Sequence, residues 1–160
     1  MDMSELVERH RKNGILVDTN LLVLLATGIY RRARISTFNR TRQYTPDDFD
    51  ILVRLISLFQ KRIVTPHIVA EADNLARQLP STEHRGIAAA ITALVSDSFE
   101  IYCPSVDATR HERYVALGVT DCTIVVASRD ALVVTDDLRL SNILTHLGRD
   151  AININHIRAL

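Results

Sequence analysis

The sequence is short of the features that mark extracellular and membrane proteins. Its 160 residues include two cysteines, Cys103 and Cys122, which exclude a disulfide framework and are typical of a reducing compartment. The longest apolar run covers residues 21–26, far fewer than the ~20 residues that cross a bilayer. Residues 1–13 lack the apolar segment of a secretion signal. We therefore expect a cytoplasmic protein that does not associate with membranes.

Glycine and lysine are also scarce, and their positions argue against several nucleotide- and phosphate-handling classes. The five glycines form neither the G-x-G-x-x-G pattern of dinucleotide-binding enzymes nor a P-loop. The two lysines, Lys12 and Lys61, leave the chain after residue 61 without one. Aspartyl phosphatases of the haloacid-dehalogenase type and phospho-receiver domains both need a lysine late in the chain, so both classes are disfavoured.

Positive and negative charge balance over the whole chain, with 19 Lys and Arg against 19 Asp and Glu. No overall field would therefore draw the protein onto a nucleic acid or a membrane. Residues 30–45 differ, because this segment has no acidic residue and five arginines: Arg31, Arg32, Arg34, Arg40 and Arg42. These arginines either grip a phosphate backbone or form a solvated charged surface. The interleaved Tyr30, Phe38 and Tyr44 either stack on unpaired bases or anchor the segment to the core.

Short apolar runs alternate with longer helical segments along the chain. Five runs predict strands, at residues 15–18, 62–65, 99–102, 131–135 and 151–154. The segments between them predict helices at 19–29, 46–60, 67–78, 81–98, 120–128 and 137–146, with a short helix within 105–117. This alternation predicts an α/β fold, with three α/β/α layers around a central parallel sheet of four to five short strands. We expect one domain over residues 1–160, with residues 1–13 as an N-terminal helical extension and residues 30–45 as an Arg-rich insertion.

Acidic residues recur near the points where these strands end. Asp18 ends the first strand, and Glu71 lies one turn into the helix after the second. Asp121 opens a later helix, and Asp136 and Asp137 follow the fourth strand. Each of these acids, taken alone, is also consistent with a helix cap or a first-turn acid. Because ligands of parallel sheets bind at the carboxyl ends of the strands, however, we expect these acids to converge.

A cluster of carboxylates is repulsive unless cations neutralise it. Oxygen ligands of this kind suit Mg²⁺ or Mn²⁺. A carboxylate-bound divalent ion beside an Arg-rich segment is typical of phosphate-ester chemistry, in which the ion activates water and stabilises charge on phosphoryl oxygens.

The segments that carry these acids resemble, in order and spacing, the four acidic motifs of PIN domains. The matching stretches are ILVDTN at 15–20, TPHIVAE at 65–71, GVTDC at 118–122 and VVTDD at 133–137. The resemblance extends over about residues 13–155.

The resemblance implies a role for each acid. It implies that Asp18, Glu71 and Asp121 hold the metal ion directly or through water. It selects Asp137 as the fourth acid, with Asp136 as the alternative. It also implies supporting roles for Asn20, which orients the first motif, and for the hydroxyl of Thr135.

PIN domains are metal-dependent nucleases, and many are ribonuclease toxins of bacterial toxin–antitoxin pairs. The resemblance therefore implies an endoribonuclease that uses Mg²⁺ or Mn²⁺ to hydrolyse RNA, and it allows an antitoxin protein and a homodimer as partners. The alternative is a catalytically inactive PIN-like module that binds RNA or protein. The complete set of acids favours the active enzyme, whereas the insertion at 30–45 departs from compact toxin members, which usually lack it.

Overall fold

The computed structural model describes residues 3–157 and has a five-stranded sheet at its centre. The strands are β1 (Ile15–Val17), β2 (Arg62–Val64), β3 (Phe99–Glu100), β4 (Leu132–Thr135) and β5 (Ala151–Asn153). They lie in the order β3-β2-β1-β4-β5, and every neighbouring pair is parallel. The predicted α/β fold with a parallel sheet is therefore confirmed.

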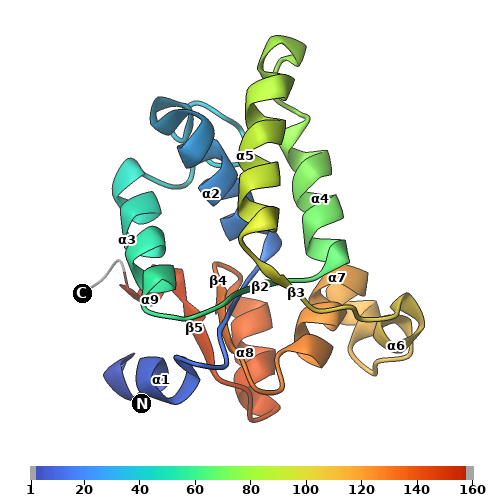
Figure 1. Ribbon diagram of the computed structural model, residues 1–160. Helices are drawn as coiled ribbons and strands as arrows, with labels where there is room; N and C mark the ends of the chain where they lie inside the picture. The colour runs from blue at the N-terminus through green and yellow to red at the C-terminus, as the bar shows by residue number, and fades with distance from the viewer. Residues whose placement is uncertain (1–2, 158–160) are drawn as a thin grey trace.

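Helices cover both faces of this sheet and give the three expected layers (Figure 1). One layer contains α2 (Thr19–Arg31), α3 (Pro46–Ser57), α4 (Pro66–Ala76) and α5 (His84–Ser96), which stand above the sheet in Figure 1. The opposite layer contains α1 (Met3–His10), α7 (Tyr114–Ala127) and α8 (Leu138–His146). Shorter pieces complete the described chain: α6 (Ser105–Thr109), α9 (Ile154–Ile157), and the 3-10 turns η1 (Arg32–Arg34) and η2 (Ser81–Glu83). No helix within residues 3–157 has the length and apolar character needed to cross a membrane.

The N-terminal helix is hydrogen-bonded to the residue that precedes the last strand. The Asp150 carboxylate lies next to β5 and accepts from Arg9 Nη1 at 2.9 Å and from His10 Nε2 at 2.7 Å. Helix α1 lies within the predicted extension at residues 1–13, of which residues 1 and 2 fall outside the described range. Residues 158–160, at the other end of the predicted domain, also fall outside it.

Two of the helix starts follow from the local sequence as predicted, whereas α5 begins at His84 rather than at residue 81, and α7 begins at Tyr114 rather than at residue 120. Before α3, the Thr45 hydroxyl accepts from the Asp48 backbone N–H, and the Asp48 carboxylate accepts in return from the Thr45 N–H. Pro46 then takes the first helical position, where its missing N–H costs nothing. Thr65 and Pro66 open α4 in the same way, with the Thr65 hydroxyl accepting from a backbone N–H.

The order of the strands creates a crevice at one point of the sheet. The chain passes from β1 to β2 and β3 on one side, and then crosses over so that β4 and β5 lie on the other side of β1. The connections after β1 and β4 therefore leave the sheet in diverging directions, and the space between them is where open α/β sheets bind ligands. Residues Asp18 and Asp136 directly follow these two strands.

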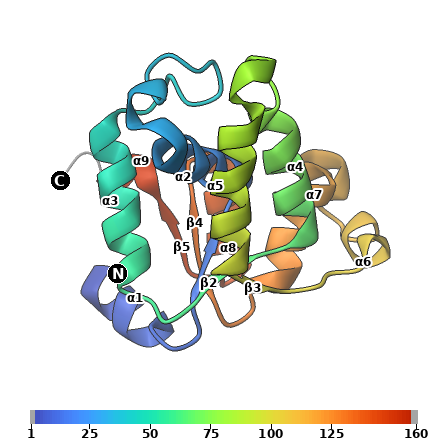
Figure 2. The ribbon, with the colours of Figure 1, turned by 45° about the horizontal axis from the view of Figure 1, so that its top comes forward.

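The Arg-rich segment at 30–45 is packed against the molecule. Helix α2 runs on to Arg31, η1 adds one turn, and hydrogen-bonded turns lead to α3; Figure 2 shows this stretch arching over the end of α2. Ile35, Phe38 and Tyr44 are buried in the core. The interpretation that Phe38 and Tyr44 stack on bases is therefore wrong, because neither ring is available, and their role as core anchors is confirmed.

Candidate functional site

The four acids selected from the sequence line one small cavity at the carboxyl ends of β1 and β4. Its volume is about 160 Å³, and its lining consists of Asp18, Thr19, Asn20, Glu71, Asp121, Asp137 and Leu140. The acids come from four separate places in the chain: the end of β1, the middle of α4, the middle of α7 and the start of α8. The cavity is thus built by the fold rather than by any local stretch of sequence.

Asp18 is the most enclosed of these acids, with 4% of its surface exposed. Its Oδ1 accepts from the Leu21 N–H at 2.9 Å and caps α2. Its Oδ2 accepts from the Thr135 hydroxyl and from the Asp136 N–H at 3.2 Å. Burial, followed by the negative charge of Asp136, raises the pKa of Asp18 to about 8, although these hydrogen bonds oppose the rise. The Thr135 hydroxyl thus contacts the first acid, in keeping with its predicted supporting role.

Asp121 reaches the cavity because α7 is broken just before it. Gly118 has a φ of +80°, which glycine adopts without steric cost, and a new helical segment follows. Burial, followed by the charges of Asp137 and Glu71, raises the pKa of Asp121 to about 6, and the nearby Arg139 only partly opposes this. The cavity therefore holds more negative charge than its protein neighbours neutralise.

The other two acids lie at the rim of the cavity, where they are exposed. Glu71 Oε2 accepts from the Thr19 hydroxyl at 3.2 Å. Asp137 caps α8, with Oδ1 accepting from the N–H groups of Arg139 at 2.7 Å and Leu140 at 3.1 Å.

Asp136 lies beside the cavity but does not line it. Its Oδ1 accepts from Asn20 Nδ2 at 3.1 Å, and its Oδ2 accepts from the Tyr44 hydroxyl at 2.5 Å. Burial, followed by the charge of Asp136, raises the pKa of Tyr44 well above its ordinary value, so the phenol stays a proton donor. Sequence reasoning had not connected Tyr44 with the acids; its only signal was an aromatic residue in an Arg-rich segment.

The side chains that line the cavity offer oxygen ligands to a divalent cation. Within residues 3–157, no three His, Cys, Asp or Glu side chains form a ready-made set of metal ligands. The donors are nevertheless all oxygens, carry excess negative charge, and include two acids whose charged forms are disfavoured. Mg²⁺ keeps several waters and is commonly held by one or two carboxylates, so this donor set fits a hydrated Mg²⁺ or Mn²⁺ ion.

Most arginines of the 30–45 segment are already engaged by the protein itself. Arg32 forms a two-pronged pair with Asp50, and Arg34 bonds Glu83 through Nε at 2.9 Å and Nη2 at 2.6 Å. Arg40 Nε donates to the side chain of Gln78 at 2.7 Å. Arg31 lies over the Tyr30 ring, 5.3 Å from its centre, and Arg42 is exposed. A phosphate backbone would therefore compete with carboxylates for Arg32 and Arg34.

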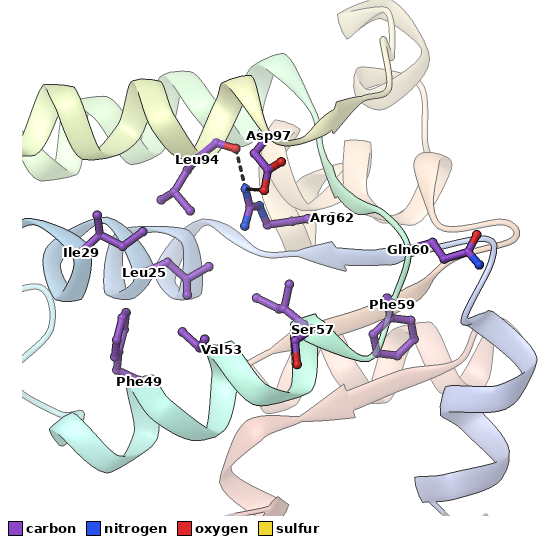
Figure 3. A pocket seen from close by; sticks show the side chains of 11 residues that line it. Leu25, Ile29, Phe49, Val53, Ser57, Phe59, Gln60, Arg62, Leu94 and Asp97 are labelled. Carbon is purple, nitrogen blue, oxygen red and sulfur yellow. Dashed lines mark hydrogen bonds and ion pairs between the residues drawn. The ribbon is translucent and has the colours of Figure 1, made fainter.

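A second hollow lies between α2, α3 and α5, away from the acids (Figure 3). Its volume is about 460 Å³, and most of its wall is apolar, with Leu25 and Phe49 on neighbouring helices. Arg62 and Asp97 are the charged residues in its lining. None of the predicted acids contributes to this groove.

No protein-family model matches the chain, and no curated protein matches its sequence.

Proposed function

We propose that this protein is a PIN-like endoribonuclease that hydrolyses RNA phosphodiester bonds with Mg²⁺ or Mn²⁺. One observation carries the proposal: four acids from distant parts of the chain line one cavity at the crevice of a parallel sheet, without enough positive charge to balance them. Carboxylates that repel each other in a buried place are costly to the fold. An external cation would remove this cost.

The cation would be held by Asp18, Glu71, Asp121 and Asp137. When bound, it would supply Lewis-acid stabilisation of the phosphoryl oxygens and lower the pKa of water. Hydrolysis adds water across the P–O bond and leaves a 5′-phosphate on one product and a 3′-hydroxyl on the other.

The chain contributes orientation and a low-dielectric environment. The Leu21 N–H and the Thr135 hydroxyl fix the two oxygens of Asp18, so this carboxylate is oriented before any ligand arrives. Because its pKa is raised, Asp18 would release a proton when a cation binds near neutral pH. Arg42 is exposed on the neighbouring segment and available for a backbone phosphate.

The preference for RNA, an antitoxin partner and a homodimer follow from the resemblance to PIN domains and remain predictions. A second candidate is an inactive PIN-like module that binds RNA or protein. It is favoured by the absence, within residues 3–157, of three side chains already arranged as metal ligands. Cleavage separates the two functions, since a binding module would leave RNA intact.

The test uses a labelled single-stranded RNA, with Mn²⁺ or with EDTA, and the variant Asp121→Asn. We expect cleavage by the wild-type protein only with the metal, and a loss on the order of 10³-fold in the variant, because the cavity loses a charged ligand. Asp73→Asn is the matched control, since Asp73 lies on α4 two residues from Glu71 but does not line the cavity. Undiminished cleavage by Asp121→Asn, or equal cleavage in EDTA, would contradict the proposal.

A further inference from the structure

Hydrogen bonds fix both the side chain and the backbone of Asp136. Beyond the two side-chain bonds from Asn20 and Tyr44, its backbone carbonyl accepts from Asn155 Nδ2 at 3.1 Å, and its backbone N–H donates to Asp18 Oδ2 at 3.2 Å. The residue therefore joins the start of α2, the 30–45 segment, α9 and the end of β1. Its neighbour Asp137 is the one that lines the acid cavity.

Tyr44 is the long-range member of this group. Its side chain is buried, with 2% of the residue exposed, and its hydroxyl reaches Asp136 across 92 residues of sequence. Its backbone is fixed on both sides, because its N–H bonds the Thr41 carbonyl at 2.8 Å and the next residue, Thr45, caps α3. The hydroxyl is thus presented from a rigid position, as a second layer of a functional site requires.

The turn from β4 into α8 offers two adjacent acids, and of these Asp137 lines the cavity. If Asp136 were released, its carboxylate would be free to turn toward the cavity, where a fifth negative charge adds repulsion. Its N–H would then lose its fixed place on Asp18 Oδ2. The orientation of Asp18 and the choice of Asp137 thus depend on the same anchored residue.

We propose that Tyr44 is a positioning residue of the acid cavity, whose hydroxyl holds Asp136 aside so that Asp18 is oriented and Asp137 faces the cavity. This inference rests on the proposed metal-dependent nuclease function. It also assigns a role to the 30–45 segment: the segment carries Tyr44 to the site, while Arg32 and Arg34 fasten it to Asp50 and Glu83.

The test compares Tyr44→Phe with Tyr30→Phe. Both variants lose one phenol hydroxyl. Tyr30, however, packs against Gly86 on α5 and contacts Glu83, which is not one of the acids of the cavity. We expect Tyr44→Phe to weaken Mn²⁺ binding, measured by calorimetry, about tenfold, and to lower kcat for RNA about 10- to 100-fold at unchanged KM. Tyr30→Phe should leave all three quantities at their wild-type values.

A merely structural role for Tyr44 would lower the melting temperature but not the Mn²⁺ affinity or kcat of the folded protein. The route through Asp136 is tested by adding Asp136→Asn. If Tyr44 acts through Asp136, the double variant should bind Mn²⁺ no more weakly than the weaker of the two single variants. Additive losses would overturn that route.

Failure of this inference is distinguishable from failure of the proposed function. If the wild-type protein cleaves RNA, Asp121→Asn does not, and Tyr44→Phe matches Tyr30→Phe in Mn²⁺ affinity and kcat, only the role of Tyr44 is overturned. If the wild-type protein neither binds Mn²⁺ nor cleaves RNA, both are overturned.

Discussion

The acid cavity and the apolar groove between α2, α3 and α5 give a buried charge different partners, although burial disfavours the charged form in both: it lowers the pKa of Arg62 and raises that of Asp18. In the groove, the Arg62 side chain is 12% exposed, and its guanidinium donates to the Leu94 carbonyl at 2.7 Å (Figure 3). It also donates to the Ser98 hydroxyl at 2.9 Å. It also lies 3.5 Å from the Asp97 carboxylate. In the cavity, Asp18 accepts from neutral donors only and has another carboxylate, that of Asp136, as its charged neighbour.

A third charge shows that the cavity is the unusual case. Burial works against the charge of Asp150, but hydrogen bonds from His10 and Arg9 outweigh it and hold the pKa of this carboxyl below its ordinary value. The fold therefore gives Asp150 hydrogen bonds from Arg9 and His10 that outweigh its burial, whereas the charge of Arg139 does not offset the burial and mutual repulsion of the acids at the carboxyl end. Because charge is costly to bury without a partner, this difference supports the proposal that the partner of the cavity comes from outside the chain.

The largest expected effect is on the pH dependence of stability without metal. The pKa of Asp18 is raised from its ordinary 3.8 to about 8, so the folded state binds an extra proton between these values. The resulting stability is fully present below about pH 4 and is lost as the pH rises through about 8, a change on the order of 5 kcal/mol. Urea unfolding in EDTA should therefore give a free energy of unfolding that falls from pH 5 to pH 9.

Asp18→Asn sharpens this expectation, because an amide cannot ionise. At pH 5 the wild-type carboxyl is already protonated, and the amide differs from it in placing a second donor hydrogen among the N–H and O–H groups that Asp18 accepts from, which costs about 1 kcal/mol. At pH 9 the variant should be more stable than the wild type, so the two pH curves should cross. A flat wild-type curve would show that the hydrogen bonds to Asp18 offset its burial, as those to Asp150 do.

The main elements of the fold could be predicted because their signals are local. The apolar run around Val133 and Val134 is too short for a helix and lies between turn residues, so it indicates a strand. The Thr-Pro pairs likewise indicate where α3 and α4 begin. The third strand was overestimated: residues 99–102 alternate, but only Phe99 and Glu100 pair with β2, at an exposed edge of the sheet. The order of the strands has no local signal, since helical crossovers permit several orders.

The positions of the site acids could be predicted in part. That parallel strands bring Asp18, Glu71, Asp121 and Asp137 together follows from the topology. The choice between Asp136 and Asp137 does not, because the contacts that hold Asp136, such as the one from the Tyr44 hydroxyl, exist only in the tertiary structure. For the same reason the sequence did not predict that the protein itself binds these arginines, because the partners of Arg34 and Arg40 lie 49 and 38 residues away.

Mn²⁺ gives the next largest expected effect. If an external cation completes the cavity, Mn²⁺ at about 100 times its Kd should stabilise the protein by about 2.7 kcal/mol, which raises the melting temperature by roughly 5–10 °C. A thermal scan at pH 8 with and without Mn²⁺ measures this shift. Asp121→Asn should abolish it, and Asp73→Asn should retain it. An equal shift in Asp121→Asn would mean that the ion binds elsewhere.

The smallest expected effect concerns Arg62, the hydrogen-bonded charge of the groove. Arg62→Met keeps the length and the apolar stem of the side chain but removes the donors to Leu94 and Ser98, so we expect a loss of about 1–2 kcal/mol in the free energy of unfolding. The exposed Arg54 on α3 provides the control, because Arg54→Met should change this quantity by less than about 0.5 kcal/mol. The Mn²⁺ shift should be intact in both variants, since neither residue lines the cavity. If Arg62→Met instead stabilises the protein, the charge in the groove is as poorly balanced as that of Asp18, and the contrast between the two hollows disappears.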